Sequence, residues 1–216
     1  MEFLYDILYL IPSVLIAFVL HELAHGLMST LLGDPTPRRQ GRLSLNPLKH
    51  LDPYGTVCLI LFNVGWAKPV VVNTEYYKNK KLGMALVALA GPLMNFILAI
   101  ISLVIIAIMY KYANIYNRFN SILLTFFYYL SINNLGLALF NLIPIPPLDG
   151  SKVIGGFLSD DAYDMYMSIE RYGFIILMAL LGLSALRGNG VSFISQFIQT
   201  VYETLLFGIF RLFGLI

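Results

Sequence analysis

The segment VLHELAHGLMSTLLG, residues 19–33, places three ionisable side chains in the middle of an apolar run. The surrounding stretch, residues 7–32, is long enough to cross a bilayer, which takes about 20 residues of helix. A charged side chain near the bilayer centre costs about 2.5 kcal/mol or more, so His21, Glu22 and His25 together require a compensating partner. A divalent cation is one such partner, and hydrogen-bonding groups on neighbouring helices are the other.

The composition indicates a membrane protein throughout. Of the 216 residues, 58% are hydrophobic and 12% are charged, and the mean hydropathy is +0.77, far from the balance of a soluble domain. Spanning helices and their connections use almost all of this length, so we expect a single membrane-embedded domain over residues 1–216. The formal net charge of +2, from scattered basic residues, argues against a nucleic-acid partner. Cys58 is the only cysteine, which excludes an intramolecular disulfide and a cysteine-based metal site.

Apolar runs of spanning length predict an all-α integral membrane protein with about five to six transmembrane helices. The runs cover residues 7–32, 82–110, 121–145, 172–186 and 191–216. The last run carries a polar stripe of Gln196, Gln199, Thr200 and Glu203, so it either spans against other helices or lies in the membrane interface. A shorter run, residues 55–66, has the length of a re-entrant segment.

The connection between the first two spans contains the β-forming pieces GRLSLNP, residues 41–47, and AKPVVVN, residues 67–73. The second piece is rich in valine, although Pro69 restricts it to the end of a strand or the edge of a sheet. We therefore expect a small β element at the cytoplasmic membrane surface.

The distribution of basic residues predicts the orientation in the membrane. Residues 33–81 hold eight of the fourteen Lys and Arg residues, so the positive-inside rule places this connection in the cytoplasm. The N-terminus and the 111–120 loop then lie outside, in a multi-pass protein of the cell membrane. HELAH and the distant PLDG, residues 147–150, consequently fall in the same cytoplasmic half of the bilayer.

HELAH is an HExxH motif, the pattern of zinc metalloproteases. Positions i and i+4 share one face of a helix, so His21 and His25 can bind a single ion, with Glu22 beside them as a carboxylate that is not a ligand. The alternative is a pair of core histidines that form hydrogen bonds with neighbouring helices. The cost of ionisable groups in lipid makes this alternative less favourable.

Catalytic zinc usually has three protein ligands and keeps a fourth position for water, so a third ligand is required. The candidates are His50, Asp52 and Asp149. We favour Asp149, because the prolines before it break a span and expose backbone at membrane depth, where irregular backbone is buried in protein or lines a wet cavity. The alternative for Asp149 is an acidic residue of a surface turn. For His50 we favour a position in an interfacial loop over a role as a partner of the metal ligands.

Three segments together resemble the site-2 protease family of intramembrane zinc metalloproteases: HELAH, GPLMN at residues 91–95 and NLIPIPPLDG at residues 141–150. The segments GRLSLNPLKHLDPYGT and GWAKPV resemble the compact members of that family. The chain has no insertion long enough for the PDZ-like domain that many members carry.

The resemblance implies hydrolysis of a peptide bond in or near a transmembrane segment, with membrane proteins or peptides as substrates. Such cleavage serves either regulated intramembrane proteolysis or the clearance of signal peptides. The resemblance further implies that His21, His25 and Asp149 bind one Zn²⁺ per chain and that Glu22 is the general base.

The resemblance also implies that Asn95 and Asn141 provide polar groups near the reacting carbonyl, although each asparagine can instead hold two helices together by hydrogen bonds. Val70, Val71 and Val72 form a candidate edge for holding an unwound substrate, or else a structural rim.

The rival functions are a membrane protein that binds or transports zinc and a catalytically inactive scaffold. Glu22 discriminates among them, because zinc transport needs no carboxylate at that spacing. The substrate and the oligomeric state stay open.

Overall fold

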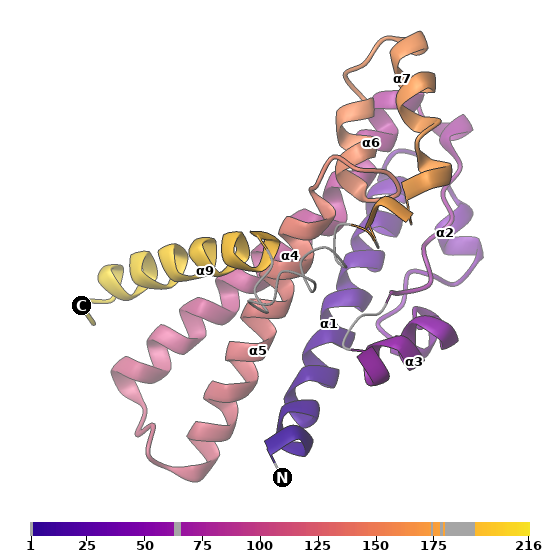
Figure 1. Ribbon diagram of the computed structural model, residues 1–216. Coiled ribbons are helices and arrows are strands. Elements are labelled where there is room, and N and C mark those ends of the chain that lie inside the picture. Colours follow the sequence, from indigo (N-terminus) through magenta and orange to yellow (C-terminus); the bar gives the residue numbers. More distant parts are fainter. Residues whose placement is uncertain (1, 63–65, 174, 178, 180–192) are drawn as a thin grey trace.

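Three long helices dominate the structure, a computed structural model that describes residues 2–62, 66–173, 175–177, 179 and 193–216. They are α1 (Glu2–Leu31), α4 (Lys80–Tyr112) and α5 (Arg118–Asn141), and they pack side by side (Figure 1). Within the described residues, these three helices are the ones long and apolar enough to cross a membrane. The expectation of a helical membrane protein is therefore confirmed, whereas a count of five to six spans is not.

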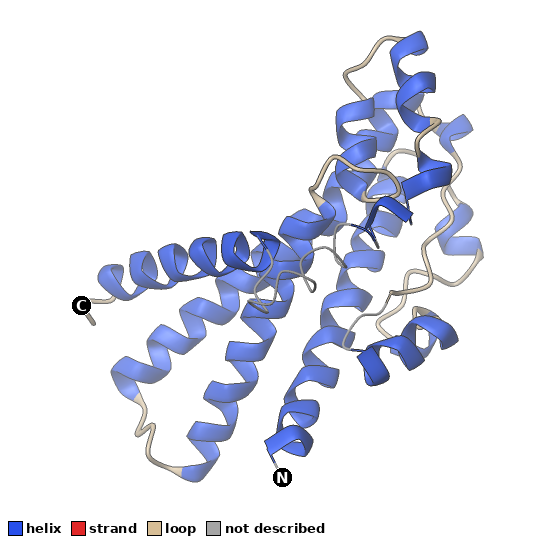
Figure 2. Cartoon of the chain, viewed as in Figure 1, coloured by secondary structure: helices blue, strands red, loops and turns tan. Residues whose placement is uncertain are grey.

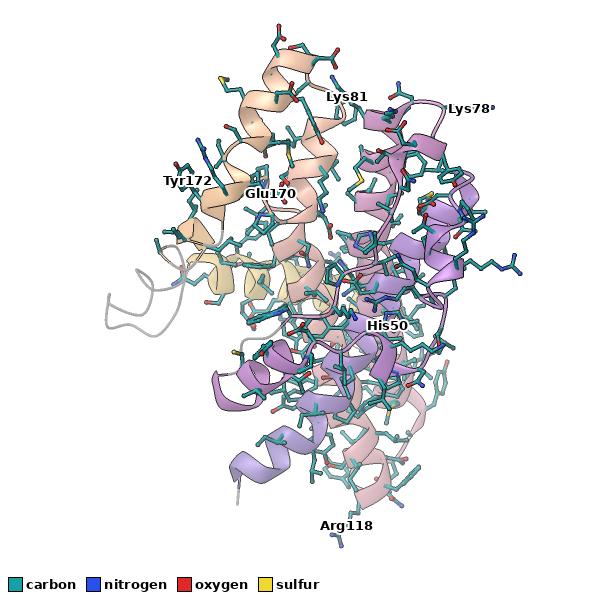
Figure 3. The ribbon with its side chains drawn as sticks, turned by 90° about the vertical axis from the view of Figure 1, so that its right-hand side faces the viewer. His50, Lys78, Lys81, Arg118, Glu170 and Tyr172 are labelled. Atoms are coloured by element: carbon teal, nitrogen blue, oxygen red, sulfur yellow. The ribbon has the colours of Figure 1, made fainter. Side chains whose placement is uncertain are left out.

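The long helices α4 and α5 begin where the sequence supplies a capping side chain. Asn79 accepts a hydrogen bond from the Leu82 amide at the start of α4, and Asn117 accepts one from the Phe119 amide at the start of α5. Lys81 and Arg118, near these two starts, lie at opposite ends of the bundle (Figure 3). The two helices therefore run in opposite directions, as the predicted membrane topology requires.

The core lies between α4, α5 and α9 (Phe193–Leu212). Its buried members are Ala99, Leu103, Ile106, Ala107, Leu135, Tyr202 and Ile209. Through Tyr202 and Ile209, α9 packs against the other helices, while Gln196, Gln199 and Glu203 remain exposed. The expected run at 191–216 is thus helical where described, but α9 is not among the three candidate spans. Most of the expected span at 172–186 lies outside the described residues.

The prolines of NLIPIPPLDG end α5 and turn the chain into a new helix. Helix α5 stops at Asn141, three residues before Pro144, because prolines at 144, 146 and 147 remove several of the backbone donors that further helical turns would need. A turn follows, and α6 (Asp149–Gly155) begins directly at the aspartate. The short α7 (Asp160–Met167) comes after it.

The connection between α1 and α4 contains short helical pieces joined by loops (Figure 2). They are α2 (Thr36–Arg39), η1 (Pro47–Lys49), α3 (Pro53–Phe62) and η2 (Thr74–Tyr76). With 10 residues, α3 reaches only about 15 Å, half of the apolar thickness of a bilayer. The described part of the predicted re-entrant run is therefore too short to span.

The expected β element is not confirmed. No strand occurs within the described residues, and residues 67–73 contribute only one isolated antiparallel bridge, between Ala67 and Leu51. The physical reason lies in the partners of this segment. Pro69 has no amide hydrogen to donate, and the amides of Val70 and Asn73 bind side chains instead of a neighbouring strand.

Candidate active site

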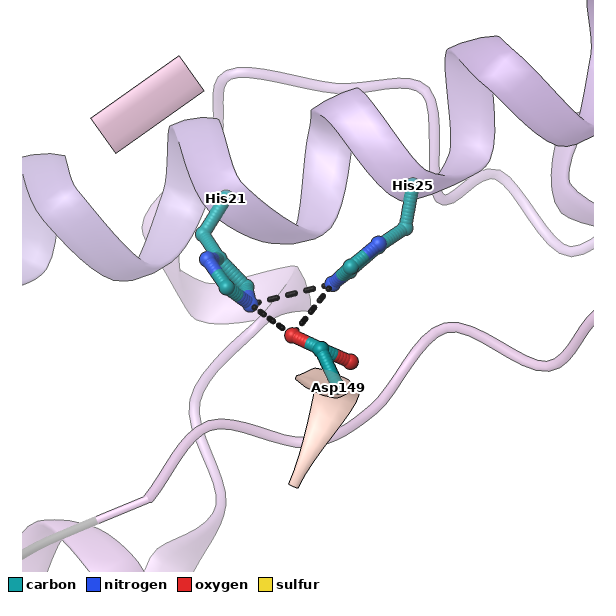
Figure 4. Close-up of side chains that lie close together, drawn as sticks. All are labelled: His21, His25 and Asp149. Atoms are coloured by element: carbon teal, nitrogen blue, oxygen red, sulfur yellow. Dashed lines mark hydrogen bonds and ion pairs between the residues drawn. The ribbon is translucent and has the colours of Figure 1, made fainter. Parts of the chain in front are cut away.

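Two histidines of α1 and one aspartate of α6 converge on a single point (Figure 4). The Nε2 atoms of His21 and His25 lie 3.0 Å apart. The Oδ2 atom of Asp149 lies 3.1 Å from the first and 3.3 Å from the second. Both histidines are buried, at 6% and 9% exposure. A side chain 128 positions along the chain thus completes the pair of histidines.

Gly91 allows α4 to close over the two histidines. A Cβ atom added at this glycine would lie 2.4 Å from Nε2 of His25 and 2.7 Å from Cε1 of His21. One turn earlier in α4, the Val87 carbonyl accepts a hydrogen bond from Nδ1 of His25 at 2.7 Å. The glycine of GPLMN is therefore required by the packing of α4 against the imidazoles.

Gly150 likewise allows a close approach, here between α6 and the end of α5. A Cβ atom added there would lie 2.3 Å from the Leu142 carbonyl oxygen at the end of α5. The glycine after Asp149 thus lets the first turn of α6 approach α5 closely, which fixes the aspartate opposite α1. This contact explains why the turn reads as aspartate followed by glycine.

The hydrogen-bonding pattern of the three groups leaves a lone pair that a shared cation would satisfy. A carbonyl oxygen only accepts, so the bond to Val87 puts the proton of a neutral His25 on Nδ1 and leaves a lone pair on Nε2. That lone pair faces Nε2 of His21 and the carboxylate of Asp149. A neutral His21 has at most one proton on Nε2, which can satisfy only one of these two acceptors.

Zinc fits this donor set. Imidazole nitrogen and carboxylate oxygen are standard zinc ligands, and bonds of about 2.0–2.2 Å in a tetrahedral site put neighbouring ligand atoms about 3.3–3.6 Å apart. The observed separations of 3.0, 3.1 and 3.3 Å are close to that range. His21, His25 and Asp149 can therefore hold the ion with little movement.

Glu22 is held beside the three groups by the backbone of a distant segment. Its Oε2 atom accepts a hydrogen bond from the Val70 amide at 2.8 Å, and the side chain is 9% exposed. Within the described residues, no donor binds its other carboxylate oxygen. Glu22 therefore has a fixed position and one oxygen left for a further partner.

These groups line a common cavity of about 190 Å³. Its walls are formed by α1, α4, α6, the end of α5 and the segment that carries Val70. The lining residues are His21, Glu22, His25, Pro69, Val70, Val72, Met84, Val87, Ala88, Asn141, Pro147, Asp149 and Lys152. The cavity is large enough for water and for a short stretch of peptide backbone.

Residues 67–73 are fixed along one side by neighbouring groups. The Lys68 amide donates to the His50 carbonyl at 2.7 Å, and Nη2 of Arg42 donates to the Pro69 carbonyl at 3.2 Å. Arg42 is buried, and its Nη1 atom donates a second hydrogen bond to the Lys49 carbonyl. The guanidinium thus ties two parts of the connection together.

Asp34 fixes the far end of the same segment. This buried carboxylate accepts hydrogen bonds from the Asn73 amide, the Thr36 amide and the Ser29 hydroxyl, at 2.7–2.8 Å. Burial by itself would raise the pKa of the carboxyl group, but the bonds from Thr36, Asn73 and Ser29 outweigh it and lower the pKa below the ordinary value. Asp34 therefore stays ionised and links the end of α1 to the segment.

The other expected site residues separate into two groups. Asn141, Val70 and Val72 line the cavity, whereas Val71 is 55% exposed. Asn95 is fully buried one turn beyond Gly91, does not line the cavity, and has no hydrogen-bond partner within the described residues. The structure thus brings one of the two asparagines to the site.

The two rival candidates for third ligand lie apart from the histidine pair. His50 is fully buried inside the connection, where Nε2 donates to the Ser44 carbonyl at 2.7 Å, so its ring is enclosed by the loop. Asp52 accepts a hydrogen bond from the Gly55 amide at 2.8 Å at the start of α3. Both side chains therefore have local structural partners.

Sequence reasoning missed Lys152 in the cavity and the roles of Arg42 and Asp34 in the connection. Lys152 follows Asp149 by three residues, so a helix starting at the aspartate puts both on one face, and this spacing was an available signal. Arg42 and Asp34 had no comparable signal, because their partners are backbone groups distant in sequence.

Comparison with known proteins agrees with this geometry. The family model described as Peptidase family M50 matches residues 9–123 and 109–183. The chain therefore belongs to peptidase family M50, the family of the site-2 proteases, and is a zinc metalloprotease.

The relatives carry the same description. The Bacillus subtilis protein named "Putative zinc metalloprotease YwhC" is 40% identical over 173 residues, which cover 80% of this chain and 79% of that protein. Rip2 of Mycolicibacterium smegmatis, of the same description, is 27% identical over 77% of this chain and 64% of its own length. No solved structure matches the chain significantly.

Proposed function

We propose that this zinc metalloprotease hydrolyses peptide bonds in or near transmembrane segments of membrane proteins or peptides. The observation that supports this proposal most directly is that Asp149 lies 3.1–3.3 Å from His21 and His25, two residues of a helix of membrane-spanning character, with Glu22 in the same cavity. A protease whose two histidine ligands belong to such a helix works where its substrate helices are.

His21, His25 and Asp149 would hold the zinc ion, one per chain. Bound zinc would supply Lewis acidity toward a water molecule and toward the substrate carbonyl. The free carboxylate oxygen of Glu22 would accept a proton from the attacking water and later return it to the leaving nitrogen. The Val70 amide keeps the carboxylate oriented for both transfers, since it occupies only Oε2.

The segment around Val70 would hold the substrate in an extended form. A helical substrate has its backbone groups occupied by its own hydrogen bonds, so it must unwind before hydrolysis. The amides of Val71 and Val72 have no hydrogen-bond partner within the described residues, and neither do the carbonyls of residues 70–72. An unwound peptide can pair with these groups as an added strand would.

Asn141 is the candidate donor to the developing oxyanion. It lines the cavity, and its Nδ2 atom donates one hydrogen bond to the Leu137 carbonyl within α5, which leaves a second N–H for a ligand. Asn95, buried away from the cavity, would act through the packing of α4.

The membrane arrangement follows from charge. Residues 33–81 carry most of the basic side chains, so we assign this connection and the mouth of the cavity to the cytoplasmic side of the cell membrane. All helices would then form a single multi-pass domain around the site, and water would enter from the cytoplasm.

The direct test compares the wild-type protein with Glu22→Gln in lipid nanodiscs, using a panel of single-span substrates and mass spectrometry of the products. We expect both proteins to retain about one zinc per chain and only the wild type to cleave, at sites within or next to the apolar segment. Equal cleavage by both proteins would overturn the assignment of Glu22. Zinc uptake into vesicles without any cleavage would favour transport.

A further inference from the structure

Lys152 is a basic residue that lines the active-site cavity, and the reaction described above assigns it no role. It lies on α6, three residues after Asp149, and it lines the same cavity. Its side chain is partly buried, and within the described residues no acidic group pairs with its ammonium. Among the described residues that line the cavity, it is the sole Lys or Arg.

Each carboxylate of the cavity already has at least one partner. Asp149 faces the two imidazoles, and Glu22 accepts the hydrogen bond from the Val70 amide. Much of the remaining lining is apolar, from valine, alanine, methionine and proline side chains. An ammonium beside such walls attracts an anion more strongly than an ammonium in open water does, because the local dielectric constant is lower.

The direction of α6 determines on which side of the reacting bond Lys152 lies. The end of α6 lies next to the first turns of α4, since a Cβ atom added at Gly156 would be 2.6 Å from Cβ of Ala85 and 3.4 Å from the Lys81 carbonyl oxygen. The ammonium of Lys81 also donates to the Leu158 carbonyl at 3.1 Å. Because α6 runs from Asp149 toward this contact, Lys152 is displaced from Asp149 toward the end of the bundle that carries Lys81. Figure 3 labels Lys81 at that end.

We propose that Lys152 is a specificity-determining residue that binds a carboxylate of the substrate. The carboxylate would lie on the side of the reacting bond that leads to the N-terminal end of α4, which is the cytoplasmic side in the arrangement above. This inference rests on the proposed function. Two sources offer the same chemistry: an Asp or Glu side chain within a longer substrate, and the free carboxyl end of a short membrane peptide.

Binding without turnover gives the first test. A single-span peptide would be prepared with Glu, Gln or Lys at each successive position of its cytoplasmic flank, and a shorter peptide with a free or an amidated carboxyl end. Affinities would be measured by fluorescence anisotropy in nanodiscs, with Glu22→Gln as the parent protein. We expect the parent to prefer at least one carboxylate peptide over its neutral partner by about tenfold, as for one charged hydrogen bond.

Variants of Lys152 then test whether this residue causes the preference for carboxylate peptides. Lys152→Ala should abolish it and leave the affinity for the neutral peptides unchanged, Lys152→Arg should keep it, and Lys152→Glu should reverse it toward the Lys peptide. Lys78→Ala is the matched control, because Lys78 is exposed and does not line the cavity. The peptide pair that responds identifies the source, a side chain or a chain end.

Two results would overturn the inference: no carboxylate preference in the parent protein, or an equal loss of affinity for acidic and neutral peptides in Lys152→Ala. Zinc content, measured in each variant, separates these results from damage to the metal site. If the wild type binds carboxylate peptides through Lys152 but cleaves none of the substrates, the proposed function fails while this binding site stands.

Discussion

The backbone amide of Val70 donates a hydrogen bond to Oε2 of Glu22 at 2.8 Å, across 48 positions of sequence. One short segment thereby orients the carboxylate of Glu22 in the cavity. In the function proposed above, the same segment would also present its free backbone groups to an incoming peptide. Substrate binding and the position of the proposed general base would then be coupled through a single stretch of backbone.

Val70→Pro removes the amide hydrogen and keeps an apolar side chain, so it should release the carboxylate of Glu22. A hydrogen bond to a charged group contributes about 1.5–3 kcal/mol, so we expect kcat to fall about ten- to hundredfold with zinc content unchanged. Val70→Ala, which keeps the amide, is the control and should lose far less activity. Equal losses in the two variants would show that the side chain, and not the amide, matters.

Gly91→Ala should weaken zinc binding. The added methyl group would lie 2.4 Å from Nε2 of His25, so α4 or the imidazole must move. We expect the zinc affinity, measured by competition with a chromogenic chelator, to fall at least about tenfold. Gly136→Ala is the matched control, because the nearest atom to its added methyl group is 4.0 Å away, and zinc affinity should not change.

Asp149→Ala should lower zinc occupancy much more than His50→Ala does. The aspartate meets both histidines, whereas His50 binds the Ser44 carbonyl inside the connection. Metal content per chain, measured after purification without added zinc, checks the order. His50→Ala should lower thermal stability instead, since its ring is fully buried. The reverse order of metal loss would mean that His50 is the third ligand.

Asp34→Asn should destabilise the connection and make its stability less dependent on acid pH. The pKa of Asp34 is lowered by folding from an ordinary value of 3.8, so its stabilising effect is present above that value and is lost as the pH falls below it. We expect a cost of about 1–3 kcal/mol at neutral pH, because an amide group accepts fewer hydrogen bonds than a carboxylate.

Denaturant unfolding of both proteins between pH 7 and pH 3 checks this expectation. The difference in unfolding free energy should shrink toward the acid end, because the Asp34 carboxylate of the unfolded wild-type chain becomes protonated there before that of the folded protein. A difference that stays constant over this range would argue against an ionised Asp34 as the cause.

Much of the site could be predicted from local sequence. The i, i+4 spacing puts His21 and His25 on one face of any helix. The three closely spaced prolines before Asp149 favour an end to α5, whereas the single prolines Pro12 and Pro92 are accommodated inside α1 and α4. The strand expected around Val70 shows where such reasoning stops. A valine-rich run forms a strand only if a partner offers matching backbone groups, and here Glu22 and Asp34 bind its amides instead.

The sequence by itself therefore determined the long apolar helices, the paired histidines with Glu22 between them, and the break in the chain that precedes Asp149. The tertiary structure alone decided which acid meets the histidines, that Asn141 rather than Asn95 reaches the cavity, and that Lys152 lines it. The physical reason is the close approach of helices at Gly91 and Gly150. Local spacing sets the face on which a side chain lies, but only the packing of one helix against another sets what that face meets.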